Sequence, residues 1–462
     1  MEHLYCRFET WCRIVLSAIE IRVDEVNKKN IFLTWEWILF CKFAFQKAPA
    51  DTVCRGFLYL MHYVPIALQM FEICFTPIII ALLAVLLLSV VYLIAGFRHY
   101  VSSVGKRVSA DSARDESVPA DYVYPPVSVI VYSEDDAVNL EILLPQILCQ
   151  DYPSPFEVIV VNDGAIDSTK DVIARLEQKY SNLYMTFTPQ ESRSLSRKKL
   201  AVTLGIKAAK YNVLLHTIGA CQVPSDKWLR SMMRRFDADT DIVLGYAAPA
   251  MQEGTVHHWK RLHAFDQVRS DVEWLSWALA GRPYRGTGCN IAYRREVFFN
   301  NKGFSRSLDL KYGDDDVFIS EVARGHNTAV ELSSDSMLLH VQDNPGAMHC
   351  ADKIRRDYTA SRLRGHARLF FASCSWAWWV LIGAAVALSL VGLPSLLPMI
   401  IACVTLLVTW IVLMVTWRRT SRALWSRALL LTFPWFMSYH PVYALYYRIK
   451  GWRKRGSNLT WG

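Results

Sequence analysis

The chain has 462 residues, of which 52% are hydrophobic and 20% are charged, and its mean hydropathy is +0.16. There are 51 Lys and Arg against 42 Asp and Glu, which gives a formal net charge of +9. This composition excludes a disordered or collagen-like chain. Two long uncharged stretches exclude a purely soluble protein.

Residues 1–72 form an N-terminal segment in which we expect interfacial helices. The stretch 31–45 is apolar and aromatic, but it is short and contains Glu36 and Lys42. That pattern favours a helix lying at a membrane surface over one that crosses the membrane. Charged residues at positions 2, 7, 9 and 13 interrupt the apolar run that a cleaved signal peptide needs.

Residues 73–97 predict the first transmembrane helix. These 25 residues carry no charge, and about 20 apolar residues cross the hydrocarbon core of a bilayer. Arg98, Lys106 and Arg107 follow, so we expect the C-terminal end of this helix to face the cytoplasm. Residues 98–124 are polar and contain Pro119, which is typical of a linker.

Residues 125–345 alternate between apolar runs typical of strands and periodic patterns typical of helices, and we expect them to form one α/β domain. Strand–helix–strand repeats at this spacing predict parallel strands with helices on both faces of the sheet. Ligands bind such sheets at the carboxyl ends of the strands. Continuous apolar runs predict strands at 127–131, 156–161, 184–187 and 212–217, and helical patterns predict helices at 137–149, 167–179 and 198–210.

Two polar sites lie where such a sheet binds its ligand. Asp163 directly follows the second predicted strand, although a turn leading to a helix cap is an alternative interpretation. Arg197 and Lys198 open a helix at the end where the helix dipole disfavours cations. This local cost favours an anionic partner such as a diphosphate, and a solvated surface turn is the alternative.

A third site is the run of carboxylates Asp314, Asp315 and Asp316. Adjacent carboxylates repel one another, so the pKa of one of them should rise. A general base or a metal site uses such a cluster. The alternative is an acidic helix N-terminus, where Asp is favourable.

The second uncharged stretch, 369–417, has 49 residues and would be about 74 Å long as one helix. Gly392, Pro394 and Pro398 break it, which predicts two transmembrane helices at 375–393 and 396–417. Residues 346–374 before them are predicted to be an amphipathic interface segment. Basic residues outside both ends predict a hairpin with its ends in the cytoplasm.

Residues 418–462 carry nine basic residues and no acidic residue. We therefore expect a basic cytoplasmic tail that lies on an anionic membrane surface. Pro434, His440 and Pro441 interrupt its apolar part, which favours a surface-lying segment over a further span. Because the middle of the chain is near neutral, we expect no nucleic-acid partner.

Taken in order, these motifs resemble the membrane-bound family 2 glycosyltransferases over about residues 126–358. The resemblance implies a GT-A-type, Rossmann-like mixed sheet with helices on both faces, plus one N-terminal and two C-terminal transmembrane helices. The matching elements are the first strand, the strand that ends in Asp163, Lys198 with Gly205 seven residues later, the stretch 286–294 and the acidic cluster 314–316.

The resemblance also implies a nucleotide-sugar donor. Asp163 would bind the nucleotide base and Lys198 the ribose–diphosphate side, with Arg197 and Asp135 in the same site.

Family members invert the configuration of the sugar, and a carboxylate deprotonates the acceptor hydroxyl. Asp315 is expected to be this base, with Asp316 as the second choice and Asp314 beside them.

On the acceptor side the resemblance implies Gly288 and Asn290. Arg355 and Arg356 precede the membrane segment and would hold a phosphate of the acceptor. We expect that acceptor to be a glycan or a polyprenyl-phosphate lipid, with membrane lipids and other glycan-assembly enzymes as partners.

The chain departs from the family pattern at Ile218 and Ala220, which occupy the positions of an acidic pair that binds a divalent cation. Neither residue offers the oxygen ligand that Mg²⁺ requires. We therefore expect a divalent cation to be weakly bound or not required. The Gln-x-x-Arg-Trp motif of processive synthases is absent, which favours the transfer of a single sugar.

The leading hypothesis is a membrane-anchored inverting glycosyltransferase of the inner, cytoplasmic membrane, with its catalytic domain in the cytoplasm. The alternative that remains open is a catalytically impaired glycosyltransferase-like subunit that acts as a scaffold or partner in glycan assembly.

Overall fold

The computed structural model describes residues 76–113, 119, 121–134, 136–163, 169–189, 196–250, 258–341, 345–393, 395–426 and 433–458. Contacts divide the chain into two units, and the fold described below is that of the larger unit, residues 75–391 and 399–462. The interfacial helices expected in residues 1–72 lie outside the described residues.

The first apolar segment forms one continuous helical run, Pro77–Ala113. It consists of α4 (Pro77–Tyr92), a π-helical turn (Leu93–Arg98) and α5 (His99–Ala113). Thr76 caps the run by accepting a hydrogen bond from the backbone N–H of Ile79 at 3.3 Å. The prediction of a helix over 73–97 is therefore confirmed in kind, and the helix extends well beyond it.

Helix α5 corrects the prediction of a linker at 98–124. Val101, Val104 and Val108 follow helical spacing and are buried, and α5 packs against α10 (His258–Leu279). Asp111, on the same helix, is buried and pairs with Arg235 of the α/β domain. The Ser, Gly and Asp residues of this segment are typical of a linker. The segment nevertheless forms a helix, because tertiary contacts stabilise it.

The α/β domain is built on a mixed sheet of seven strands in the order β3-β2-β1-β4-β8-β6-β9. The central strands β1 to β4 run parallel, whereas β8 is antiparallel to both of its neighbours, β4 and β6. The prediction of a mixed sheet is thus confirmed. The strands are β1 (Val127–Ser133), β2 (Phe156–Asn162), β3 (Leu183–Phe187), β4 (Val213–Ile218), β6 (Ile242–Leu244), β8 (Ile291–Arg294) and β9 (Thr328–Val330).

A second sheet of three short strands lies in the order β5-β10-β7. Its strands are β5 (Cys221–Gln222), β7 (Ala247–Pro249) and β10 (Leu338–His340).

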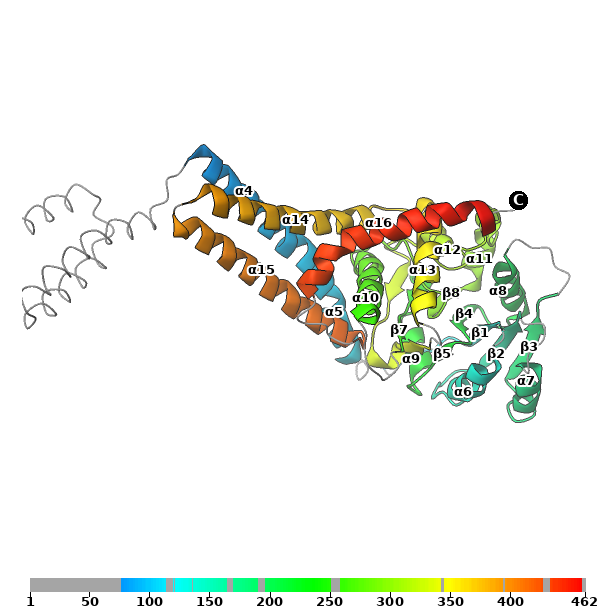
Figure 1. Cartoon of the computed structure of the whole chain (residues 1–462). Coiled ribbons are helices and arrows are strands. Elements are labelled where there is room, and N and C mark those ends of the chain that lie inside the picture. The colour runs from blue at the N-terminus through cyan, green and yellow to red at the C-terminus, as the bar shows by residue number, and fades with distance from the viewer. Residues whose placement is uncertain are drawn as a thin grey trace, which may run out of the picture. The chain divides into compact units, whose positions relative to one another are not determined.

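Helices cover both faces of the large sheet, as expected from strands that are apolar on both sides (Figure 1). On one face Val129 and Val131 of β1 join the core formed with α6 (Ala137–Leu148). On the other face Gly205 of α8 (Arg197–Ala208) lies so close that a Cβ atom would meet Ile130 and Val161 at 2.8 Å. Only glycine fits this contact between helix and sheet.

Among the residues that the structure describes, three helices are long and apolar enough to cross a membrane: the run Pro77–Ala113, α14 (Ala367–Val391) and α15 (Leu396–Ala423). This agrees with one predicted span before the domain and two after it. Helix α14 begins at Ala367 rather than at 375, and α15 continues to Ala423 rather than ending at 417. Helix α14 packs along α4 within the same unit.

The C-terminal tail is more helical than its prolines predicted. Helix α16 (Phe433–Asn458) continues through Pro441, which the prediction treated as a break. A proline removes one backbone hydrogen bond, and packing of α16 against α13 (Pro345–Thr359) and α14 offsets that loss. Trp378 of α14, for example, donates a hydrogen bond to Ser438 at 2.8 Å.

Candidate active site

The predicted site residues gather where the central strands end. Ser133 of β1 is in register with Asn162 of β2, and Tyr132 is in register with Ile218 of β4. The segments that follow these strands therefore meet at one edge of the sheet. A cavity of about 20 Å³ opens there, and its lining includes Tyr132, Lys198, His216, Ile218, Gly288, Asp314 and Asp315.

Asp163 and Arg197, both predicted to bind the donor, lie side by side at this edge. Arg197 Nη2 is 2.8 Å from Asp163 Oδ1. Tyr132 donates a hydrogen bond to Asp163 Oδ2 at 3.2 Å, and burial together with Glu134 and Asp163 raises the pKa of this tyrosine. Asp135, the fourth predicted donor residue, lies outside the described residues.

Lys198 lies between the donor edge and the acidic cluster. Its Nζ is 2.7 Å from Asp314 Oδ2 and 5.5 Å from the centre of the Tyr132 ring. Burial opposes the charged form, but the carboxylates of Asp314 and Asp315 outweigh it and raise the pKa of Lys198. The site therefore holds a charged ammonium group at its centre.

The neighbouring lysine has a different role. Lys199 points away from the cavity and donates hydrogen bonds to the backbone carbonyls of Ser307 and Leu310 at 2.5 and 2.9 Å. Of the two adjacent lysines, only Lys198 lines the cavity.

Asp315 faces the cavity and is held by backbone groups. Its Oδ2 accepts the N–H of Gly288 at 3.1 Å and lies 3.7 Å from Arg355 Nη1, and its Oδ1 accepts the N–H of Asp316 at 2.7 Å. Burial would raise the pKa of Asp315, but Arg355 and Lys198 hold it below its usual range. Asp315 is therefore an oriented, ionised carboxylate next to open space.

Asp316 begins α12 (Asp316–Val322) and turns the other way. Its Oδ2 accepts hydrogen bonds from Thr359 at 2.5 Å and from Arg285 at 3.3 Å. Burial, followed by the charge of Asp315, raises the pKa of Asp316, as expected for one member of such a cluster. Asp316 does not line the cavity, so of the two residues predicted as the base only Asp315 borders it.

The predicted acceptor residues divide in the same way. Gly288 and Arg355 lie beside Asp315. Asn290 is fully buried, and its side chain is hydrogen-bonded to Trp228, Tyr246 and Ser336. It ties three segments of the domain together, and its placement on the acceptor side is corrected.

Arg356 is also not at the cluster. Its guanidinium lies 3.4 Å from Asp271 Oδ1 of α10, so it joins two helices. Of the two arginines predicted for the acceptor side, Arg355 lies at the acidic cluster.

The residues at the end of β4 do not fit a divalent metal ion of the family type. Ile218 and Ala220 offer no side-chain oxygen. His216 stacks on Tyr293 with ring centroids 4.7 Å apart, and burial followed by the charge of Lys198 lowers its pKa to about 3. Within the described ranges no group of three or more His, Cys, Asp or Glu could hold a metal ion.

Three residues of the site escaped the sequence analysis: Tyr132, Arg285 and Thr359. Tyr132 is the last residue but one of a strand already singled out, so its position at the ligand edge was open to prediction. Arg285 directly precedes the motif 286–294, whereas Thr359 comes from another helix, and no local pattern links either of them to Asp316.

Comparison with known proteins finds similarity to glycosyltransferases. Residues 127–300 match the Glycosyl transferase family 2 model, which covers the sheet from β1 to β8. Glycosyltransferase AglE from Haloferax volcanii is 30% identical over 106 residues, which are 23% of this chain. The match spans only 33% of that relative.

Solved structures of glycosyltransferases are similar at lower identity. A mannosyltransferase from Pyrobaculum calidifontis, in complex with GDP-Man and Mn²⁺, is 18% identical, with a TM-score of 0.47 over 80% of this chain and 99% of that one. S. aureus TarS in complex with UDP is 16% identical, with a TM-score of 0.35 over 63% of this chain and 90% of that one. Glucosyl-3-phosphoglycerate synthase from Mycobacterium tuberculosis is 12% identical, with a TM-score of 0.37 over 55% of this chain and 83% of that one.

The acidic cluster at 314–316 lies beyond the region that the family model matches, so that match alone assigns it no role. Strands β1 to β8 and the predicted donor residues Asp163, Arg197 and Lys198 lie within it. Residues 127–300 thus match a family 2 glycosyltransferase domain, the family that the ordered motifs predicted.

Proposed function

We propose that the protein is a membrane-anchored inverting glycosyltransferase that transfers one sugar from a nucleotide-sugar to a membrane-associated acceptor at the cytoplasmic face. The observation that carries this proposal is Asp315, an ionised carboxylate that borders a cavity beside Lys198 in a family 2 domain. An oriented base next to a fixed cation suits a displacement in which a diphosphate leaves.

The reaction is a single displacement. Asp315 accepts the proton of the acceptor hydroxyl, whose oxygen forms a bond to the anomeric carbon of the sugar. The bond from that carbon to the diphosphate breaks, and its electron pair leaves with the nucleoside diphosphate. Attack from the face opposite the leaving group inverts the configuration. Asp163, with Arg197 beside it, would hold the nucleotide base, and Asp135 is proposed for the same site.

The negative charge of the leaving diphosphate needs a counter-charge. We assign this role to Lys198, because its ammonium group lies at the centre of the site, whereas Ile218 and Ala220 cannot ligate a hard cation. Donor binding should accordingly depend little on Mg²⁺ or Mn²⁺. Arg355, 3.7 Å from Asp315, would hold a phosphate of the acceptor.

The membrane placement rests on three helices long and apolar enough to span a bilayer. Arg98, Lys106 and Arg107 lie in the C-terminal part of the first helical run, after its apolar part, and Arg418 and Arg419 lie near the end of the third helix. Basic flanks favour the cytoplasmic side. A lipid-linked acceptor such as a polyprenyl phosphate, and a complex with other glycan-assembly enzymes, suit this location.

A donor-hydrolysis and transfer screen tests the proposal. The full chain, purified in detergent, is offered UDP- and GDP-linked sugars with and without a polyprenyl phosphate. Release of nucleoside diphosphate is expected for one donor, and Asp315→Asn should abolish it. Asp309→Asn, which removes a carboxylate of an exposed ion pair, is the matched control. Nucleotide binding without any turnover would favour the scaffold alternative.

A labelling experiment tests the orientation. Single cysteines beside Arg98, near residues 314–316 and near Arg453 should react with a membrane-impermeant thiol reagent only after cells are opened. Labelling of the 314–316 region in intact cells would refute the cytoplasmic placement.

A further inference from the structure

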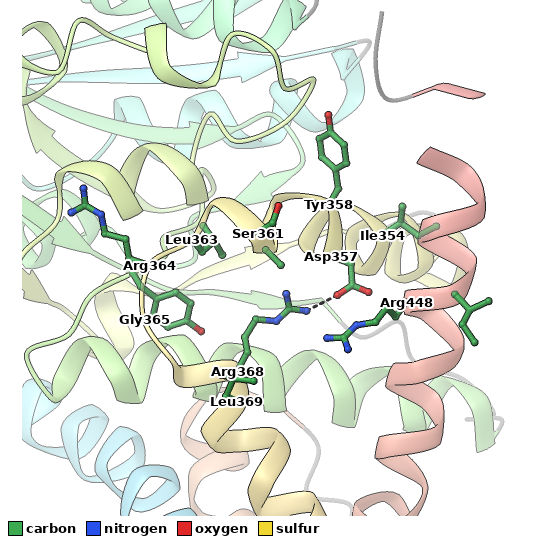
Figure 2. Close-up of a pocket in the computed structure, with 13 residues that line it drawn as sticks. Ile354, Asp357, Tyr358, Ser361, Leu363, Arg364, Gly365, Arg368, Leu369 and Arg448 are labelled. Atoms are coloured by element: carbon green, nitrogen blue, oxygen red, sulfur yellow. Dashed lines mark hydrogen bonds and ion pairs between the residues drawn. The ribbon is translucent and has the colours of Figure 1, made fainter. Parts of the chain in front are cut away.

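A second cavity, larger than the one beside Asp315, lies elsewhere in the described part of the chain. It has a volume of about 620 Å³ and lies where the end of α13, the first turn of α14 and the helix α16 come together (Figure 2). None of Lys198, Asp314 and Asp315 contributes to it. Its lining residues are Tyr284, Ile354, Asp357, Tyr358, Ala360, Ser361, Leu363, Arg364, Gly365, Arg368, Leu369, Arg448 and Ile449.

The polar part of this lining is positively charged. It contains Arg364, Arg368 and Arg448, with Asp357 as its single acidic residue. Arg368 Nη2 lies 2.5 Å from Asp357 Oδ1, and Figure 2 shows Arg448 on the other side of the same carboxylate. One carboxylate cannot neutralise three guanidinium groups, so the cavity attracts an anion. Guanidinium groups are well suited to phosphate oxygens.

The apolar part of the lining continues onto an exposed apolar surface. Leu369, at the start of the candidate span α14, is 68% exposed, and Ile449 of α16 is 46% exposed. Val442, Leu445 and Tyr446 are exposed on the same face of α16 as Ile449, at spacings of three and four residues. An exposed apolar helix face with basic residues at its end is typical of a helix at a bilayer surface.

We propose that this cavity binds the phosphate headgroup of an anionic membrane lipid. Arg368 and Arg448 would contact the phosphate, Arg364 would lie at the rim, and the hydrocarbon chain would leave along Leu369 and Ile449. The charge of the cavity selects the headgroup, and the exposed apolar side chains at its mouth select a lipid over a free ion. The site is separate from the catalytic cavity and does not require the chain to transfer a sugar.

The site is also linked to the acidic cluster. Tyr358 and Tyr284 of its wall directly precede Thr359 and Arg285, the two side chains that bind Asp316. A lipid in the cavity would therefore hold the segments that position Asp316, and with it the start of α12.

Calorimetry on the full chain in detergent tests the proposal with three probes. They are dioctanoyl phosphatidic acid, dioctanoyl phosphatidylcholine and inorganic phosphate. Phosphatidic acid should bind most tightly. Arg448→Gln should weaken its binding about tenfold or more, the scale of a lost hydrogen bond to a charged group. Arg448 has no ion-pair partner among the described residues, so this variant should fold.

Two further variants separate charge from shape. Arg362→Gln removes a nearby arginine that pairs with Asp309 at 2.5 Å outside the cavity, and it should leave lipid binding unchanged. Ser361→Trp fills the cavity without a change of charge, and it should weaken binding as Arg448→Gln does.

The proposal would be overturned by any of three results. Inorganic phosphate binding as tightly as phosphatidic acid would mean a simple ion site. Equal affinity for phosphatidic acid and phosphatidylcholine would mean that the headgroup charge is not read. Equal losses in Arg362→Gln and Arg448→Gln would mean a general charge effect. Absence of sugar transfer, by contrast, would leave the lipid site standing.

Discussion

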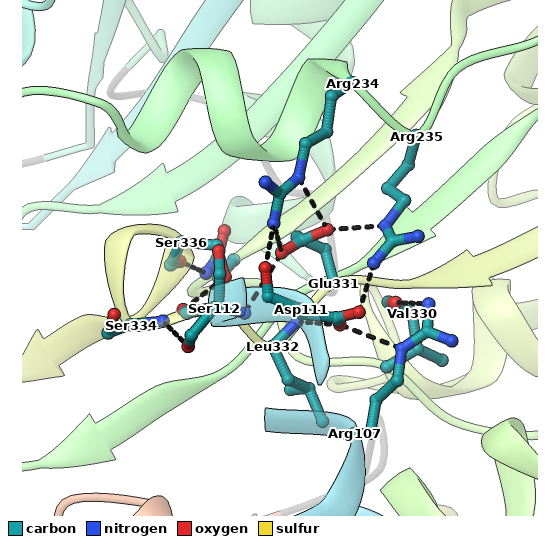
Figure 3. A network of polar contacts seen from close by, with 12 residues as sticks. Arg107, Asp111, Ser112, Arg234, Arg235, Val330, Glu331, Leu332, Ser334 and Ser336 are labelled. Atoms are coloured by element: carbon teal, nitrogen blue, oxygen red, sulfur yellow. Dashed lines mark hydrogen bonds and ion pairs between the residues drawn. The ribbon is translucent and has the colours of Figure 1, made fainter. Parts of the chain in front are cut away.

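Two buried clusters of charge in this molecule differ in what surrounds them. At the junction of α5 with the α/β domain, three arginines enclose two carboxylates (Figure 3). Arg234 Nη2 is 2.7 Å from Glu331 Oε1, Arg235 pairs with both Glu331 and Asp111, and Arg107 Nε is 2.8 Å from Asp111 Oδ2. Backbone N–H groups of Leu332 and Ser333 complete the network.

The acidic cluster 314–316 has similar partners but a different environment. The side chains of Arg234 and Glu331 at the junction are 3% and 0% exposed, whereas those of Lys198 and Arg355 are 25% and 27% exposed near the cavity that Asp315 lines. A pair such as Arg234 and Glu331, which is enclosed by protein, can only hold the fold together. One whose cations border open space can exchange a protein partner for a substrate. Substitutions in the junction cluster should therefore lower stability, whereas substitutions at the acidic cluster should lower activity or nucleotide binding.

Asp315→Asn should give the largest effect on activity. The amide keeps the shape but cannot accept a proton, so turnover should fall by about 10²–10⁴-fold while nucleotide binding changes little. Steady-state transfer assays and calorimetry with the nucleoside diphosphate measure the two quantities. Full activity in Asp315→Asn together with loss in Asp316→Asn would transfer the role of base to Asp316. Full activity in both variants would contradict the mechanism.

Glu331→Gln should act on stability. It leaves Arg234 and Arg235 buried without their carboxylate, which costs about 3–5 kcal/mol of the free energy of unfolding. Denaturant titration of the full chain in micelles measures this loss. Arg175→Gln, which breaks an exposed pair with Glu141, is the control and should cost less than about 1 kcal/mol. Equal losses in the two variants would show that the junction is not a structural cluster.

Lys198→Ala tests the cation that borders the cavity. Loss of its ammonium group should weaken binding of the nucleoside diphosphate by about 1.5–3 kcal/mol. Calorimetry with and without EDTA measures the effect, and Lys207→Ala, at the exposed end of the same helix, is the control. A strong metal requirement for binding by the unmodified chain would contradict the role assigned to Lys198.

The pH dependence of stability should sharpen the comparison further. Burial opposes ionisation of Glu331, but Arg234 and Arg235 outweigh it and lower its pKa below the usual 4.5. A lowered folded-state pKa gives stability that is present above the unfolded-state pKa and is lost as pH falls through the folded value. The stability difference between the unmodified chain and Glu331→Gln should therefore be constant near neutral pH and shrink below about pH 4.5. A difference that grows on acidification would contradict this sign.

The features that could be predicted from the sequence are those that depend on residues close to one another in the chain. The apolar runs of β1 and β2 place Asp163 at the sheet edge, and the helix that starts at Arg197 places Lys198 there. These signals need only a few neighbouring residues. Asp315, at the start of α12, is placed in the site by the resemblance of the ordered motifs to the family.

The parts that sequence missed depend on distant contacts. Nothing near Asn290 in the chain shows that Trp228 and Ser336 enclose it. Helix α5 is polar in composition, and its partners lie more than 100 residues away. The cavity lined by Arg368 and Arg448 is assembled from three separate segments. Patterns of charge and hydropathy carry no information about such assemblies until the fold is known.

The unbroken helical run Pro77–Ala113 has a mechanical consequence. A flexible tether would let the domain drift within a volume, whereas a helix fixed at its end by Asp111 acts as a strut. The 15 residues of α5 span about 22 Å at 1.5 Å per residue. With α4 in a bilayer, this helix would hold the cavity beside Asp315 at a fixed distance from the membrane surface. This fixed distance makes no difference to a solute that diffuses in from the aqueous phase. A reactive group carried on a lipid, however, would always reach the cavity at the same distance from the membrane surface.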